Sequence, residues 1–191
     1  MFNCLELKKS FDTKVELFKA LKENKTDILS LKMANVLKSC DKGNSVKTKM
    51  FDVSKHLDTV KNITMTKDCY YIVVNTTGIL DSHMDLHLKG IWTKTAQEQQ
   101  GKNYLVADHM LEIDKVITRK EHVEIIIAEI PFRSIGKDYD GNTQALIYKI
   151  PKDKVVNQAA KEWLESGDEI EASVRMQYVK VELAMNSIDI N

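Results

Sequence analysis

The chain has 191 residues, of which 43% are hydrophobic and 29% are charged, and its formal net charge is zero. This composition excludes an intrinsically disordered chain and fits one domain with a sizeable core plus an appendage. The balanced charge gives no reason to expect nucleic acid or an anionic membrane as a partner, and no apolar run approaches the roughly 18 residues of a membrane span.

Three cysteines, Cys4, Cys40 and Cys69, are scattered without the spacing of a zinc knuckle. An odd and unpatterned number of cysteines favours reduced thiols in an intracellular setting. The N-terminus lacks the apolar stretch of a signal peptide. We therefore expect a protein that works inside a cell, without a cofactor or a structural metal.

The N-terminal third is predicted to be mainly helical. Thr13 and Glu16 have the spacing of a capping box, in which each side chain accepts a backbone N–H of the other residue. A second amphipathic helix is predicted to start near Thr26 or Asp27. The polar stretch 40–45 then reads as a linker. This divides the chain into a helical segment, 1–45, and a β-rich domain, 46–191.

From Asp68 onward the pattern changes to strands. Strands are predicted at 69–74, 103–117 (one or two strands), 122–130, 143–150 and 169–183. The strand 122–130 is apolar on both faces and is therefore expected to be central. Short helices are predicted at 90–100 and after Asp153, the latter ending at Gly167. The buried face of that helix is expected to contain Val156, Ala160, Trp163 and Leu164.

The last predicted strand contains a candidate nucleophile. Side chains alternate between the two faces of a strand, so the apolar residues from Ile170 onward point to the core while Glu171, Ser173 and Arg175 point the other way. A serine hydroxyl is a weak nucleophile until a nearby base accepts its proton. Among the histidines, His109 ends the apolar run LVADH, where a rigid strand can hold its ring at a cleft.

Three segments together resemble the prohead (capsid maturation) protease family of tailed bacteriophages, serine proteases related in fold to the herpesvirus assemblins. The segments are DSHMDLHLKGIWTKT (81–95), NYLVADHM (103–110) and GDEIEASVRMQYVKVELAMNS (167–187). Their order and spacing match the family over roughly residues 68–187. The chain departs from the family after Ser-Val, where Arg175 stands in place of the glycine of many relatives.

The resemblance implies an α+β fold, an antiparallel β-barrel, closed or nearly closed, flanked by helices. It implies that Ser173 is the nucleophile and His109 its general base. The implied substrates are the major capsid protein, scaffold or delta-domain peptides and the protease itself, cleaved inside the immature capsid in the host cytoplasm. A homo-oligomer stays an open alternative.

A third catalytic residue would hold the histidine tautomer and stabilise the imidazolium. Glu171 shares the face of Ser173 and is the first choice, while Glu129 and His122 are alternatives. Backbone amides are expected to form the oxyanion hole, with the charge of Arg175 assisting as a hypothesis.

Two other functions compete with the protease. His83, Asp85 and His87 recur at alternate positions, so in a strand they would share one face and offer ligands for zinc or iron. Alternatively, the chain is a catalytically inactive structural or assembly protein of the virion, with the N-terminal helices as its docking segment.

Overall fold

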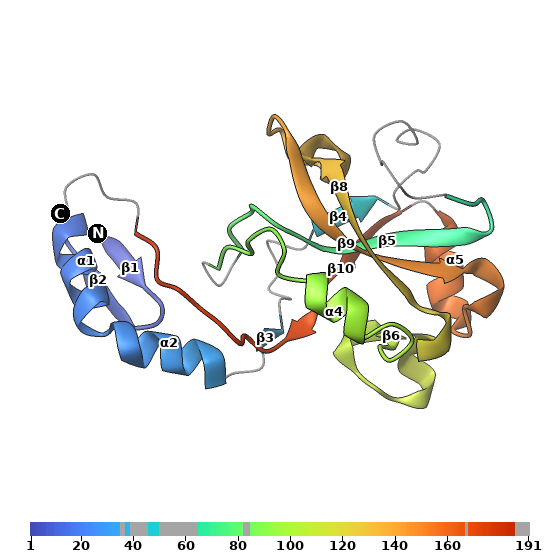
Figure 1. Ribbon diagram of the computed structural model, residues 1–191, viewed down its shortest axis with the longest axis horizontal. Helices are drawn as coiled ribbons and strands as arrows, with labels where there is room; N and C mark the ends of the chain where they lie inside the picture. Colours follow the sequence, from blue (N-terminus) through green and yellow to red (C-terminus); the bar gives the residue numbers. More distant parts are fainter. Residues whose placement is uncertain (35–36, 39–45, 50–64, 82–84, 167, 186–191) are drawn as a thin grey trace. The chain divides into compact units, whose positions relative to one another are not determined.

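The computed structural model describes the chain except for residues 35–36, 39–45, 50–64, 82–84, 167 and 186–191 (Figure 1). The described chain forms two compact units. One contains Met1–Leu37 and Arg175–Asn191, and the other contains Lys38–Val174. Two short strands, β3 (Leu37–Lys38) and β11 (Arg175–Met176), fall where the chain passes between the units. Residue 45, where the sequence analysis ends the first domain, lies outside the described residues.

Over residues 1–34, which the structure describes, the first unit is a β-hairpin followed by two helices. The hairpin pairs β1 (Phe2–Cys4) with β2 (Lys9–Phe11), and the helices are α1 (Lys14–Glu23) and α2 (Lys25–Ala34). The predicted capping box is confirmed, because the Thr13 hydroxyl accepts the Glu16 N–H at 3.2 Å and the Glu16 carboxylate accepts the Thr13 N–H at 3.3 Å. The hairpin was not predicted, since three-residue strands are too short to show a periodic pattern.

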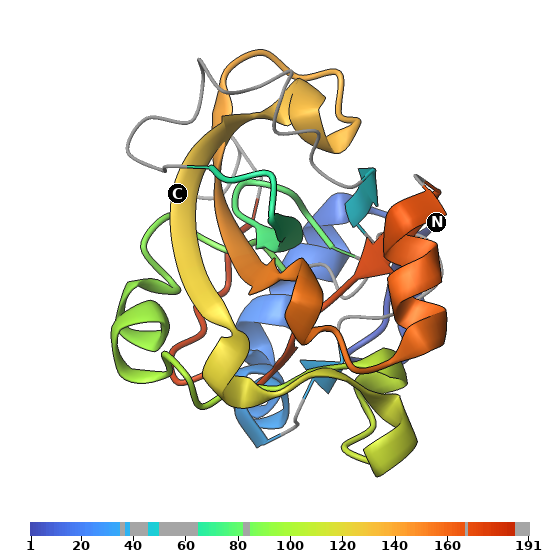
Figure 2. The same ribbon diagram turned by 90° about the vertical axis from the view of Figure 1, so that its right-hand side faces the viewer.

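The second unit is built on a three-stranded antiparallel sheet with the order β5-β9-β8. Its strands are β5 (Cys69–Thr76), β8 (Glu124–Pro131) and β9 (Asn142–Pro151). In Figure 2, β8 in yellow runs beside β9 in orange. The central position expected for β8 is wrong, because β9 lies in the middle. The strand is nevertheless apolar on both sides because both faces of the sheet are covered.

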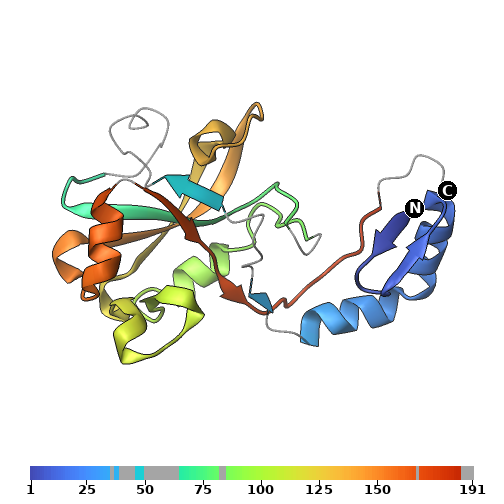
Figure 3. The same ribbon diagram turned by 180° about the vertical axis from the view of Figure 1, so that it is seen from behind.

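Two further pairs of strands complete the described sheets of this unit. β4 (Val46–Lys49) pairs with β10 (Glu169–Ala172), and β6 (Leu105–Val106) pairs with β7 (Val116–Thr118), both antiparallel. β10 lies across β5, in front of it in Figure 3 and behind it in Figure 1. None of the described sheets closes into a barrel, so the structure shows a mixed α+β fold with antiparallel sheets and does not show the barrel expected from the sequence.

The remaining elements are helices and single turns. Among the described residues of this unit, the α-helices are α4 (Thr93–Glu98) and α5 (Gln158–Ser166). The 3-10 turns are η1 (Ala107–His109), η2 (Ile113–Lys115), η3 (Lys120–His122), η4 (Phe132–Ile135) and η5 (Lys152–Lys154).

Helix α5 differs from its prediction at both its start and its buried face. Asp153 lies in η5, and the N-cap is Asn157, whose side-chain oxygen accepts the Ala160 N–H at 2.8 Å. Leu164 is buried as expected, but Trp163 is 51% exposed and Val156 is 57% exposed. The spacing of apolar residues therefore predicted the helix correctly, but it predicted more buried residues than the structure has.

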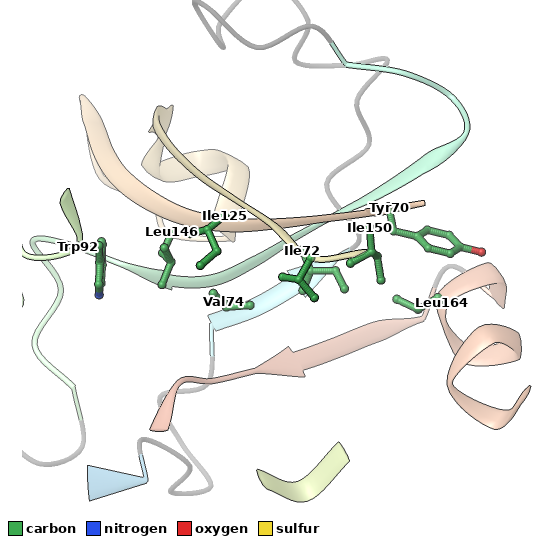
Figure 4. Close-up of a cluster of buried hydrophobic side chains, with 9 residues drawn as sticks. Tyr70, Ile72, Val74, Trp92, Ile125, Leu146, Ile150 and Leu164 are labelled. Carbon is green, nitrogen blue, oxygen red and sulfur yellow. The ribbon is translucent and has the colours of Figure 1, made fainter. Parts of the chain in front are cut away.

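The hydrophobic core consists of two clusters on opposite faces of the sheet. Successive residues of β5 alternate between them, with Tyr71 and Val73 on one face and Tyr70, Ile72 and Val74 on the other. The second cluster, which we call the lower core, is shown in Figure 4. Its buried members are Tyr70, Ile72, Val74, Trp92, Val123, Ile125, Leu146, Ile150 and Leu164. Figure 4 shows the lower core on the side of β5 and β9 where β10 and α5 lie.

Candidate active site

His109 lies at the end of a tight turn that follows a very short strand. The expectation that His109 ends a strand is wrong, because β6 ends at Val106 and His109 lies in the turn η1. The turn is closed by the Met110 N–H, which donates to the Ala107 carbonyl at 3.0 Å. Asp108 and His109 both have left-handed backbone, with φ of 52° and 57°. Left-handed conformation is rare outside glycine and is tolerated best by residues such as Asp, Asn and His.

Ser173 lies immediately after β10, which ends at Ala172. The single long strand predicted over 169–183 is therefore wrong: the chain leaves the ladder at Ser173 and pairs again only in β11. Ala172 and Val174, the neighbours of Ser173, both pack against the lower core. The half-buried serine is thus held between two anchored residues, which limits the positions that its hydroxyl can take.

The fold joins these two residues, which are 64 positions apart in the chain. His109 Nε2 and Ser173 Oγ form a hydrogen bond, and both residues are half-buried. Leu105, at the start of β6, packs against the same lower core as Ala172 and Val174. Both segments that carry the pair are therefore anchored on one hydrophobic cluster. Packing on the same cluster explains how strands as short as β6 and β10 can fix the position of His109 relative to Ser173.

The contact has the chemistry of a nucleophile and its base. When the imidazole carries its proton on Nδ1, Nε2 has a free lone pair and accepts the hydrogen of the Ser173 hydroxyl. Transfer of that proton to Nε2 as the oxygen attacks an acyl carbon is general base catalysis. Partial burial favours this step because water competes less for the hydroxyl and the ring.

The three candidates for a third residue lie in different places. Glu171 is in β10, opposite Lys47 in the ladder and two residues before Ser173, and the position of its side chain lies outside the described part of the structure. The Glu129 carboxylate forms an ion pair with Lys89 Nζ at 2.6 Å and is 43% exposed, which accounts for a charge in β8. His122 ends η3. The pKa of Asp153 is lowered mainly by the hydrogen bond from Lys154 and to the smallest extent by the charge of His122.

The proposed metal ligands divide between described and undescribed residues. His83 lies outside the described residues. The His87 ring is buried, with Nδ1 3.3 Å from Asn75 Oδ1, and it forms a T-shaped contact with the Trp92 ring at a centroid distance of 5.9 Å. Burial lowers the pKa of His87, and the nearby Asp81 and Asp85 act in the opposite direction. Within the described ranges, no three His, Cys, Asp or Glu residues cluster as a metal site.

Comparison of the chain with protein-family models, with curated proteins and with solved structures found no match. Across the part of the chain that the structure describes, no helix combines the length and the apolar character needed to cross a bilayer.

Proposed function

We propose that this chain is a serine endopeptidase of the prohead maturation type, with Ser173 as nucleophile and His109 as general base. The observation that carries the proposal is the hydrogen bond between His109 Nε2 and Ser173 Oγ. Serine on a sheet surface is common. Here, however, Ser173 lies between two residues that pack against the lower core, and its hydroxyl is hydrogen-bonded to an imidazole ring. A serine nucleophile needs such a base to take its proton.

The proposed reaction has two halves. His109 takes the Ser173 proton as Oγ attacks the substrate carbonyl, then gives that proton to the leaving amine, which leaves an acyl-enzyme ester. In the second half His109 takes a proton from water, the hydroxide attacks the ester, and the proton returns to Ser173. Glu171 is the proposed orienting carboxylate, since its place in β10 is the nearest of the three candidates in sequence to Ser173.

The remaining parts of the proposal follow from the family resemblance. They are a barrel related to that of the assemblins, cleavage of capsid and scaffold peptides and of the protease itself, and action within the prohead in the host cytoplasm. No membrane or nucleic-acid partner is proposed.

A small serine-directed reagent tests the chemistry without knowledge of the substrate. We expect diisopropyl fluorophosphate to modify the wild type at Ser173, with the adduct located by peptide mass spectrometry. Ser173→Ala should abolish labelling, and His109→Gln should slow it by about 100-fold to 10,000-fold, the range expected for loss of a general base. Ser166→Ala is the matched control, because that hydroxyl is bonded to the Trp163 carbonyl and to Asp168.

Equal labelling of the wild type and Ser173→Ala, or none of either, contradicts the proposal. The second result favours the alternative of a structural or assembly protein of the virion. Co-expression with the major capsid protein and scaffold, comparing wild type with Ser173→Ala, then tests the biological substrate.

A further inference from the structure

The four residues after His109 have features that the catalytic pair does not use. Met110 has φ and ψ of −101° and 122°, and Glu112 has −113° and 153°, so both have extended backbone. Residues 110–112 belong to no described sheet, and Ile113 is the first residue of η2; we treat Met110–Ile113 as one segment. The part of this segment before η2 is therefore strand-like backbone beside the proposed base.

The backbone of this segment offers unpaired hydrogen-bonding groups. Within the described ranges, the Leu111 and Glu112 N–H groups and the Met110 and Leu111 carbonyls have no backbone partner. Such a row of groups on an extended chain is a template for pairing with another strand. Peptides that bind by adding a strand gain affinity from these main-chain bonds.

The side chains of the segment are unusually apolar for their exposure. Met110 is 41% exposed, Leu111 69% and Ile113 98%. Exposed apolar side chains that lie next to one another often mark a surface that binds another molecule, whereas single exposed apolar side chains are ordinary. Leu111 lies between two residues with extended backbone and Ile113 opens η2, so their exposed side chains follow one another along the segment and offer an apolar surface to the side chains of a paired strand.

The segment lies close to the proposed catalytic pair because it directly follows His109 in the chain. Consecutive Cα atoms are about 3.8 Å apart, so the Leu111 Cα lies within about 8 Å of that of His109. A strand paired with the segment would extend past the His109–Ser173 hydrogen bond within two or three residues.

We infer that Met110–Ile113 is the substrate-binding edge of the enzyme, where an extended peptide pairs with the backbone and places apolar side chains against Leu111 and Ile113. This inference rests on the proposed function. It assigns the substrate class as unfolded or extended polypeptide with Leu, Ile, Val, Met or Phe at alternate positions within about four residues of the cleaved bond.

The test separates chemistry from substrate binding. The variant is the double substitution Leu111→Ser with Ile113→Ser, and the matched control is Val156→Ser, which removes a 57% exposed apolar side chain from the same unit. One measurement is the rate of labelling by diisopropyl fluorophosphate, which is too small to need the edge. The other is cleavage of a pool of tryptic peptides from a cell lysate, with the new ends sequenced by mass spectrometry.

We expect the wild type and the control to cleave with apolar residues enriched at alternate positions near the new ends. The double variant should keep its labelling rate within about twofold and lose tenfold or more in cleavage, with the enrichment gone. An unchanged profile in the double variant, no apolar enrichment in the wild type, or labelling without cleavage of any peptide overturns the inference. Absence of labelling in the wild type instead refutes the proposed function.

A second copy of the chain is the competing occupant of the surface. Light scattering after size-exclusion chromatography distinguishes it: a wild-type dimer that becomes monomeric in the double variant shows a homotypic interface and also overturns the inference. If the wild type and the double variant have the same mass, a homotypic interface is excluded and the cleavage profile alone tests the inference.

Discussion

The side-chain amide of Gln100 bonds to both backbone polar groups of Ile125. Gln100 Nε2 donates to the Ile125 carbonyl at 2.5 Å, and Gln100 Oε1 accepts the Ile125 N–H at 2.9 Å. Ile125 belongs to β8, an outer strand of the described sheet, and its side chain is part of the lower core. The amide thus takes the place that a neighbouring strand would occupy at this edge.

Gln100→Ala should lower the free energy of unfolding by about 1–3 kcal/mol, since the substitution leaves two backbone groups of β8 without their partner. Gln100→Glu should cost more at neutral pH, because a carboxylate cannot donate to the Ile125 carbonyl. Urea unfolding followed by circular dichroism measures both. Gln97→Ala, at an exposed position of α4, is the control, and an equal effect of Gln97→Ala and Gln100→Ala contradicts the prediction.

Asp108 tests whether the left-handed turn positions the His109 ring. Asp108→Val should strain the turn, because a β-branched residue resists positive φ at a cost of about 1–2 kcal/mol. If the strain is relieved by movement of the ring, labelling by diisopropyl fluorophosphate should slow by about tenfold, the equivalent of about 1.4 kcal/mol. Asp108→Asn and Asp108→Gly, both compatible with the turn, should keep the wild-type rate. Slow labelling in all three variants would assign the effect to the carboxylate.

The buried ring of His87 predicts a pH dependence of stability. Burial lowers its folded-state pKa below the ordinary 6.5, so below that pH the unfolded chain takes up a proton that the folded chain does not. Stability should therefore fall as the pH decreases from about 7.5 to 5.5, with a contribution of up to about 1.4 kcal/mol per pH unit.

Urea unfolding at several pH values checks this slope. His87→Gln removes the titrating ring and should flatten the profile, although it lowers stability at pH 7.5. His122→Gln makes the same substitution at a half-buried position in η3 and measures how much the exchange itself changes stability at pH 7.5. A slope that is the same in His87→Gln and the wild type refutes the assignment.

The capping box at the start of α1 makes a prediction for the first unit. Thr13→Ala should destabilise α1 by about 1 kcal/mol, because the Glu16 N–H loses its acceptor. Thr13→Ser keeps the hydroxyl and should lie close to the wild type. Hydrogen exchange of the α1 amides measures the effect, and equal protection in Thr13→Ala and Thr13→Ser contradicts it.

Local features of the fold were predictable because they depend on residues close in sequence. The capping box at Thr13, the strands at 69–74 and 143–150, and the presence of a helix before Gly167 were all read from spacing and composition. Errors arose where packing decides. β8 has the pattern of a central strand, but both its faces are covered while its edge is bonded by Gln100. The alternation after Ile170 continues past the end of β10, so periodicity alone overran the strand.

The candidate site shows the same division. From the sequence alone came two residues of suitable chemistry, Ser173 and His109, in an order and spacing that resemble a protease family, and an apolar run beside each. Their hydrogen bond was decided only in the tertiary structure, by the packing of Leu105, Ala172 and Val174 on one cluster. Helices, turns and strands form from contacts a few residues apart. A contact across 64 residues depends on how whole strands pack, which no local pattern encodes.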